Sequence, residues 1–251
     1  MEIVCWKRSQ YLVKMINIIT IKWGTKFSHK HPNKLYRDCK DKCSFDFNFY
    51  CITDDAAGID PNIIVLDMPT HSNLNYNDYI EDHLARKTLL WDRPKLYMFI
   101  DFDFKGTNIF LDLDAQVEQD LVYLTTLPDK KPWIIDMWWK KNWRENWDKL
   151  WNGRVNSSIV VWRDDQCRGV TEAVLKNAQD NFNKYSTIDT FISYELVDYE
   201  NYNNTFFDFL PPFVCCFGKD FVPKNNEYKI VLWSSSPGAW HGGIPEVPGV
   251  N

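Results

Sequence analysis

The chain has 251 residues, 45% of them hydrophobic and 25% charged, which is typical of one α/β domain, or at most two small ones, with a sizeable core. The formal net charge is −5 and no long basic run occurs, so nucleic acid is disfavoured as a partner, whereas acidic clusters are compatible with a divalent cation. The seven cysteines include no CxxC pair, which argues against a zinc ribbon and favours buried thiols in a reducing compartment.

The first residues lack the apolar core of a signal peptide. The apolar stretch at residues 11–21 is interrupted by Lys14 and Asn17 and is too short to span a bilayer. We therefore expect a cytoplasmic protein, or a soluble part of an assembly, without a membrane span. Residues 1–15 are predicted to be a peripheral extension, and residues 16–251 a single domain.

Strands and helices are predicted to alternate along the first half of the chain. A β-branched stretch at residues 16–22 indicates a buried strand that stops at a glycine turn. A helix with apolar residues at three-to-four spacing follows Pro32, a residue suited to a first helical turn. The further expected elements are strands at residues 46–52, 62–68 and 107–112, with helices at 79–90 and from about residue 91.

The second half continues with strands and two helical segments. Strands are expected at residues 133–138, 155–162, 213–217 and 228–233, helices at 168–185 and 188–196, and a loop rich in Ser, Pro and Gly at 234–249. Alternating strands and helices favour a mostly parallel, doubly wound (Rossmann-like) α/β sheet flanked by helices. Such sheets bind ligands at the carboxyl ends of their strands, so functional residues should follow strands.

The pair Asp112 and Asp114 closes the most convincing strand. Side chains at i and i+2 of a strand point the same way, so both carboxylates are expected to reach one hard cation, Mn²⁺ or Mg²⁺. Such a cation would neutralise a diphosphate leaving group. The alternative is a solvated or turn-forming pair. A second pair, Asp101 and Asp103, follows a predicted helix and is more typical of a capped connection.

Several motifs, in order, resemble the GT-A glycosyltransferases, particularly the glycogenin-like family 8 group and its bacterial and viral relatives. They lie at residues 18–26, 50–55, 91–97, 109–115, 155–162 and 186–192. The resemblance implies a GT-A fold and a metal-dependent enzyme. It would transfer a sugar from a nucleotide diphosphate sugar, most simply a UDP-sugar, to a glycan or other hydroxyl acceptor, with retention of the anomeric configuration.

The resemblance also implies a role for each matching residue. Asp112 and Asp114 would hold the metal and diphosphate, and Lys95 would pair with a phosphate or sugar oxygen. Asp189 would lie near the reacting carbon. Asn156 and Ser157 would bind the sugar, and the remaining donor contacts would be Thr20, Trp23, Gly24, Thr53, Asp54 and Leu113. Each of these residues outside the aspartate pair could instead have a purely structural role. Lys95 could be a solvated helix lysine, Asn156 could end a turn, and Asp189 could be a helix N-cap.

The sequence departs from the family at three places. The strand at residues 230–233 runs into Ser234 instead of the His-Gly that supplies the family's third metal ligand, and the nearest His-Gly pair begins at His241. Either His241 reaches back to the metal or Ser234 has replaced the ligand. Thr190 stands where the family has glutamine, and Ser158 where it has glycine, which leaves the donor sugar open.

Two rival functions follow from the same residues. One is a catalytically silent module that binds a sugar nucleotide or a glycan. The other is a nucleotidyltransferase, which is disfavoured because no glycine-rich phosphate loop with a basic partner lies near the N-terminus. The acceptor is not readable from the sequence. The irregular residues 70–80 and the Trp-rich residues 133–151 could wall an acceptor cleft, although the helical spacing of the tryptophans favours core packing.

Overall fold

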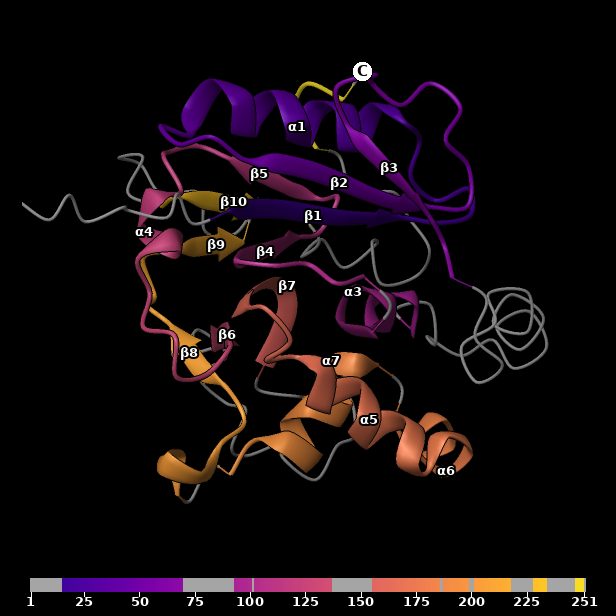
Figure 1. Cartoon of the computed structure of the whole chain (residues 1–251), viewed down its shortest axis with the longest axis vertical. Coiled ribbons are helices and arrows are strands. Elements are labelled where there is room, and N and C mark those ends of the chain that lie inside the picture. The colour runs from indigo at the N-terminus through magenta and orange to yellow at the C-terminus, as the bar shows by residue number, and fades with distance from the viewer. Residues whose placement is uncertain are drawn as a thin grey trace, which may run out of the picture.

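The computed structural model describes residues 15–69, 93–100, 102–136, 155–185, 187–198, 201–217, 228–233 and 247–250. A seven-stranded sheet in the order β3-β2-β1-β4-β7-β6-β8 runs through it (Figure 1). Its strands are β1 (Ile16–Lys22), β2 (Asn48–Thr53), β3 (Ile64–Asp67), β4 (Thr107–Leu111), β6 (Trp133–Asp136), β7 (Val155–Arg163) and β8 (Asp208–Leu210).

The strand directions bring several strand ends to one edge of this sheet. The pairs β1–β2, β2–β3 and β1–β4 are parallel, whereas β7 is antiparallel to β4 and to β6. The N–H of Asp112 donates to the carbonyl of Ser158 at 3.0 Å, so the end of β4 lies against the beginning of β7. The carboxyl ends of β2, β1 and β4 and the amino end of β7 therefore share one edge, here called the site edge.

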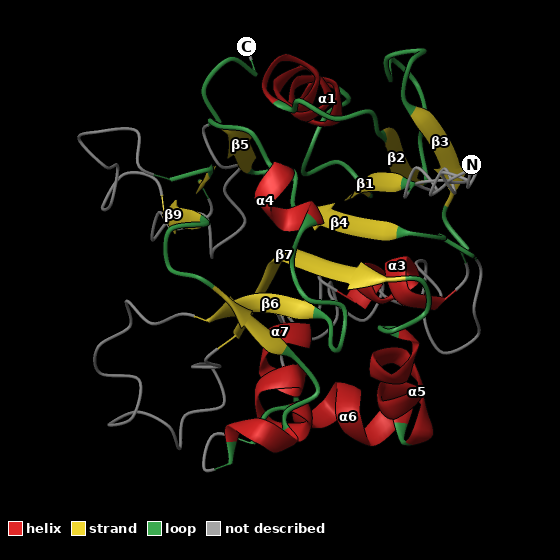
Figure 2. Ribbon diagram, turned by 60° about the vertical axis from the view of Figure 1, so that its left-hand side comes forward, coloured by secondary structure: helices red, strands yellow, loops and turns green. Residues whose placement is uncertain are grey.

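Helices cover both faces of the sheet (Figures 1 and 2). One face carries α1 (Lys30–Lys42), α4 (Val122–Thr125) and a second sheet of order β5-β10-β9. The strands of that sheet are β5 (Ala115–Val117), β9 (Cys215–Phe217) and β10 (Ile230–Leu232). The other face carries a 3₁₀ turn (Arg93–Leu96), α3 (Tyr97–Ile100), α5 (Arg168–Lys176), α6 (Ala178–Lys184) and α7 (Ile188–Phe191), which continues as a π-helical turn (Ile192–Leu196). A further 3₁₀ turn spans Tyr202–Asn204.

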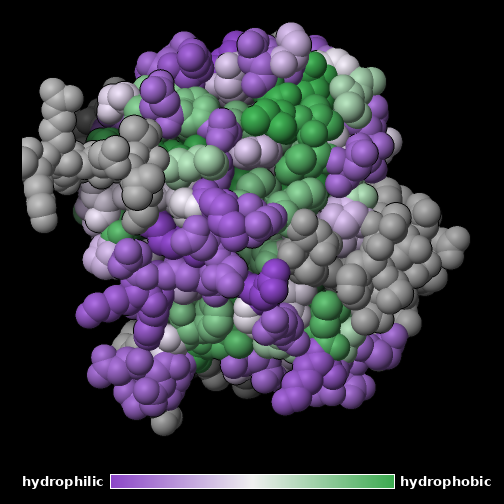
Figure 3. Space-filling view, in the orientation of Figure 1, coloured by the Kyte–Doolittle hydropathy of each residue, from purple (hydrophilic) through white to green (hydrophobic). Residues whose placement is uncertain are grey.

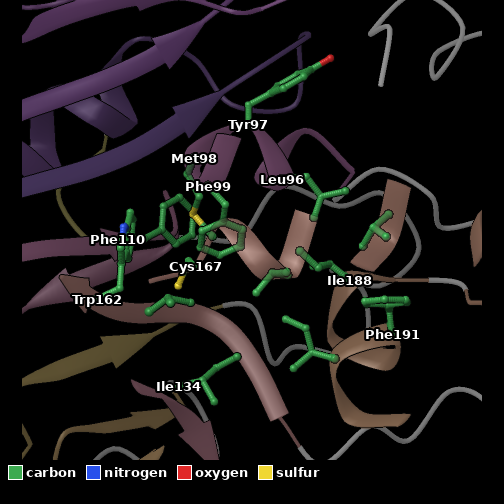
Figure 4. Close-up of a cluster of buried hydrophobic side chains, with 14 of the residues drawn as sticks. Leu96, Tyr97, Met98, Phe99, Phe110, Ile134, Trp162, Cys167, Ile188 and Phe191 are labelled. Carbon is green, nitrogen blue, oxygen red and sulfur yellow. The ribbon is translucent and has the colours of Figure 1, made fainter. Parts of the chain in front are cut away.

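Alternation along the buried strands divides the core into two clusters. In β1, Ile19 and Ile21 face the helices α3, α5 and α7, whereas Ile18 faces α1. The first cluster joins Leu96, Tyr97 and Met98 to Phe110, Trp162 and the buried residues of α5 and α7 (Figure 4). Both faces of β4 are buried, so the polar Thr107 and Asn108 are buried together with the apolar residues 109–111.

The surface seen in Figure 3 is mostly hydrophilic, with smaller hydrophobic areas between. Within the described ranges, no helix combines the length and the hydropathy needed to cross a bilayer. The cytoplasmic location stays a prediction. The cysteines that the structure describes with their side chains are free thiols, and Cys39, Cys51, Cys167 and Cys215 are buried.

The structure confirms the mostly parallel α/β sheet and most of the predicted elements. The predicted helix at residues 168–185 is instead two helices, α5 and α6, because Asn177 leaves the helical conformation at φ −138° and ψ 55°. The short elements β5, α4 and β8 were not predicted. The predictions for residues 1–14, 70–80 and 79–90, and for most of the Trp-rich segment, lie outside the described residues.

Candidate active site

Asp112 and Asp114 lie in the turn that joins β4 to β5. The strand ends at Leu111, and the N–H of Ala115 donates to the carbonyl of Asp112 at 3.0 Å. The two residues are therefore in a tight turn and not, as the sequence predicted, at the end of a strand, so alternation along a strand does not set the directions of their carboxylates. Asp114 is only 6% exposed and Asp112 is partly buried. Between them Leu113 is buried, at 4% exposure, which anchors the turn.

Lys95 links this turn to the start of β7. Its Nζ donates to Asp112 Oδ2 at 2.7 Å and to Ser157 Oγ at 3.3 Å, and it lies 5.8 Å from the centroid of the Phe110 ring. The side chains of Lys95 and Asp112 are 11% and 19% exposed. The ion pair is thus largely removed from water, and a solvated helix lysine no longer describes Lys95.

Asp189 joins the same group of residues from α7. Its Oδ1 accepts the N–H of Ser157 at 2.8 Å, and its carbonyl accepts the hydroxyl of Ser193 at 2.7 Å. The N-cap of α7 is Thr187, whose hydroxyl accepts the N–H of Thr190, so Asp189 is not the N-cap. Burial raises the pKa of Asp189, and the charge of Asp112 adds to this, while Lys95 and the Ser157 hydrogen bonds oppose it.

Asn156 and Ser157 sit at the amino end of β7. Ser157 is fully buried, whereas Asn156 is partly exposed and accepts the N–H of Ser158 through Oδ1 at 2.9 Å. Asn156 belongs to the strand, so the alternative of a turn at this position is wrong. Ser158, which stands where the resembled family has glycine, is 3% exposed. Its N–H donates the hydrogen bond to Asn156 Oδ1.

The predicted nucleoside contacts lie at the neighbouring ends of β1 and β2. Gly24 adopts φ 57°, a conformation that favours glycine, and its N–H donates to Asp54 Oδ2 at 2.9 Å. Thr53 Oγ1 donates to the carbonyl of Asp55 at 3.0 Å, and Trp23 packs against the cluster on the α3 side. Thr20 is fully buried, with no hydrogen-bond partner for Oγ1 among the described residues.

Lys26 was not among the predicted site residues. It lies in the loop between β1 and α1, is partly buried, and interacts electrostatically with Asp114, Asp112 and Lys95. Burial lowers the pKa of Lys26, and the two carboxylates oppose that shift. The sequence signal that could have pointed to Lys26 is its position two residues after the glycine turn that follows β1. The fold was needed to show that this loop follows a strand paired with β4, whose end carries Asp112 and Asp114.

The carboxylates of Asp112 and Asp114 provide some, but not all, of the ligands that a hard cation needs. Carboxylate oxygens suit Mg²⁺ and Mn²⁺, which commonly take few protein carboxylates plus phosphate oxygens and water. Within the described ranges no group of three or more His, Cys, Asp or Glu side chains could hold a metal. His241 and Ser234 lie outside these ranges, so the third protein ligand stays a prediction. The chain leaves the described part at Trp233, whose N–H donates to the carbonyl of Asp114 at 3.0 Å.

Asp103 lies away from this group. It precedes β4, at the end of the strand opposite the site edge, and forms an exposed ion pair with Lys105. This position agrees with the expectation that the Asp101–Asp103 pair lies in a connection between elements. Asp101, its predicted companion, is outside the described residues.

Comparisons with known proteins define the fold. No protein-family model and no curated protein sequence matches the chain. Among solved structures, the galactosyltransferase LgtC in complex with donor and acceptor sugar analogues matches at a TM-score of 0.50 and 10% identity, covering 90% of this chain and 92% of LgtC. An active-site variant of LgtC matches at a TM-score of 0.53 and 9% identity, covering 90% and 93%. The chain therefore has the GT-A fold of these glycosyltransferases, as the sequence resemblance implied.

Proposed function

We propose that this protein is a glycosyltransferase that moves a sugar from a nucleotide diphosphate sugar, most simply a UDP-sugar, to a hydroxyl group of a glycan or other acceptor. The observation that carries the proposal is the connected group at the site edge. Asp112, Lys95, Ser157 and Asp189 come from four separate segments and are joined by hydrogen bonds of 2.7, 3.3 and 2.8 Å. The GT-A fold and the complex of LgtC with donor and acceptor sugar analogues support the same function.

The charges of the group suit a donor with a diphosphate. Asp112 and Asp114 would hold Mn²⁺ or Mg²⁺, and the cation would stabilise the negative charge that grows on the departing diphosphate. Lys95 adds a positive charge on the sugar side of the turn, where the partly exposed Asn156 would offer its amide to sugar hydroxyls and the buried Ser157 holds Lys95 in place. Asp189, next to Ser157, is positioned to bind the sugar or the acceptor hydroxyl.

Retention of the anomeric configuration is part of the proposal and rests on the family 8 resemblance. Proton NMR of the first product formed from a UDP-sugar would test it directly. A product whose anomeric proton shows inversion would contradict this part and leave the transfer itself standing.

Binding of UDP with and without Mn²⁺ tests the donor site. We expect Mn²⁺-dependent binding by calorimetry, slow hydrolysis of a UDP-sugar, and loss of both in the double variant Asp112→Asn, Asp114→Asn. The variant Asp103→Asn is a matched control, because Asp103 is exposed and belongs to a similar Asp-x-Asp pair away from the site edge. UDP binding that ignores both the metal and the double substitution would overturn the role of the pair.

The donor sugar is open, and a thermal-shift screen across nucleotide sugars would identify it. The diphosphate sugar that raises the melting temperature most, in the presence of Mn²⁺, is the expected donor. Nucleotide binding without turnover of any donor, with or without an added sugar acceptor, would instead identify a silent binding module.

A further inference from the structure

The candidate donor contacts follow the order of the strands along the site edge. The sheet runs β2, β1, β4, β7, and these strands carry in turn Asp54, the loop with Gly24, the Asp112 turn and Ser157. In the proposed function the nucleoside lies at the β2 end and the sugar at the β7 end. A nucleotide sugar that spans both ends must place its diphosphate between them, over β1 and β4.

Lys26 is a basic side chain at the site edge that was not predicted to be among the donor contacts. It belongs to the loop after β1, and its ammonium group interacts with the carboxylates of Asp114 and Asp112 and with Lys95. Its Nζ also lies 5.4 Å from the centroid of the Phe27 ring. The loop is braced by the bond from Gly24 N–H to Asp54, and it follows β1, the strand that pairs in parallel with β4. Lys26 therefore lies in a loop at the site edge, beside the end of β4.

The negative charges of the turn and of a bound diphosphate together exceed the positive charge of Lys95, so a second ammonium group could bind there. Asp112 and Asp114 carry two negative charges, and Lys95 already pairs with Asp112 and Ser157. A nucleoside diphosphate adds about two to three negative charges at neutral pH, given a phosphate second pKa of about 6. A cation on the aspartates and Lys95 on the sugar side would balance part of this charge. Lys26 follows β1, which lies between β4 and the proposed nucleoside end at β2.

We propose that Lys26 binds the diphosphate of the nucleotide sugar, as a compact positive charge on the nucleoside side of the Asp112–Asp114 turn. This inference rests on the proposed function. It makes Lys26 a binding residue that recognises the phosphates and not the base. A lysine suits this task because its ammonium is a point charge that can follow phosphate oxygens.

The test compares UDP with uridine on the full chain by calorimetry in the presence of Mn²⁺. We expect Lys26→Met to weaken UDP binding about 10- to 100-fold, the range for a lost hydrogen bond to a charged group, and to leave uridine affinity within about 2-fold. Lys26→Arg should recover most of the UDP affinity. The control Lys30→Met removes an exposed lysine in the first turn of α1 and should change neither affinity.

The outcomes separate this inference from the proposed function. If the wild-type chain binds no nucleoside diphosphate, the proposed function fails and the role of Lys26 falls with it. If the wild-type chain binds UDP and Lys26→Met binds it equally well, only the role of Lys26 fails. Equal losses for UDP and uridine would show that Lys26 only supports the loop, which overturns the inference. Should Lys26→Met fold poorly, Lys26→Gln in the same comparison decides.

Discussion

Lys95 and Asp112 form a largely buried ion pair whose contribution can be separated from that of each single charge. Removing one partner leaves the other charge poorly solvated, so we expect Lys95→Met or Asp112→Asn to lower the free energy of unfolding by up to about 3 kcal/mol. The double variant should lose less than the sum, because neither charge is then left alone. Urea denaturation of the four proteins gives the coupling energy.

The exposed pair Lys184–Glu195 is the control for this cycle. Its side chains are 59% and 40% exposed, and Lys184→Met should change stability by no more than about 0.5 kcal/mol. Additive effects of Lys95→Met and Asp112→Asn would contradict a coupled pair.

Asp189 predicts a pH dependence with a definite sign. Burial raises its pKa above the ordinary value of 3.8, so the native state holds the proton more tightly than the unfolded chain does. The stability from this group is fully present below pH 3.8 and is lost as the pH rises through the raised pKa. We expect Asp189→Asn to equal the wild type in acid and to become the more stable protein towards pH 7.

The same substitution should lower sugar transfer by about 10²- to 10³-fold, as for the loss of one group that stabilises a transition state. A gain in stability with a loss of activity marks a functional carboxylate. The exposed Asp180, changed to Asn, should alter neither property. Urea melts at stepwise pH, together with a transfer assay, check both effects. If Asp189→Asn were less stable than the wild type at neutral pH, the predicted direction of the pH dependence would be wrong.

At the scale of elements, α7 is short and depends on its N-cap. Thr187 accepts the N–H of Thr190 at 3.1 Å, and Asp189 lies in this first turn. Thr187→Ala should cost about 1 kcal/mol of stability and also lower activity, because Asp189 loses its support. Thr187→Ser keeps the hydroxyl and should retain most of both. Thermal melts and transfer assays of the two variants test this prediction. Equal losses in Thr187→Ala and Thr187→Ser would show that the cap hydroxyl has no role.

The sequence predicted the long elements of the fold because each carries a strong local pattern. The β-branched run of β1 and the apolar residues 109–111 of β4 are clear examples. The elements β5 and β8 are three residues each and are set by pairing with strands far away in the chain, which no local pattern encodes. Lys26 was not predicted for the same reason, because Asp112 and Asp114, with which it interacts, lie in a turn far along the chain. Asp112 and Lys95 could be predicted because they stand in a recognisable motif.

At the scale of the whole molecule, residues 1–14 precede the described part of the chain. Met15 is the first described residue, and its carbonyl accepts the N–H of Thr107 at 2.8 Å. A chain that starts at Met15 keeps this bond, so we expect its melting temperature to fall by no more than about 2 to 4 °C, with UDP binding unchanged. A chain that starts at Asn17 loses this bond and should melt lower. A large loss on removing residues 1–14 alone would show that they belong to the domain.

The turn that carries Asp112 and Asp114 is also the covalent joint between the two sheets. On its far side, β5 is held by β10, and Trp233 bonds both to Asp114 and, at 3.0 Å, to Gln116, 117 residues earlier in the chain. Such distant pairings close large loops and tend to form late in folding. We therefore expect the two aspartates to reach their final positions only after residues 230–233 have been made and have paired with β5. A nascent or C-terminally truncated chain would have the larger sheet without the finished Asp112–Asp114 turn, and under the proposed function nucleotide binding would report completed folding.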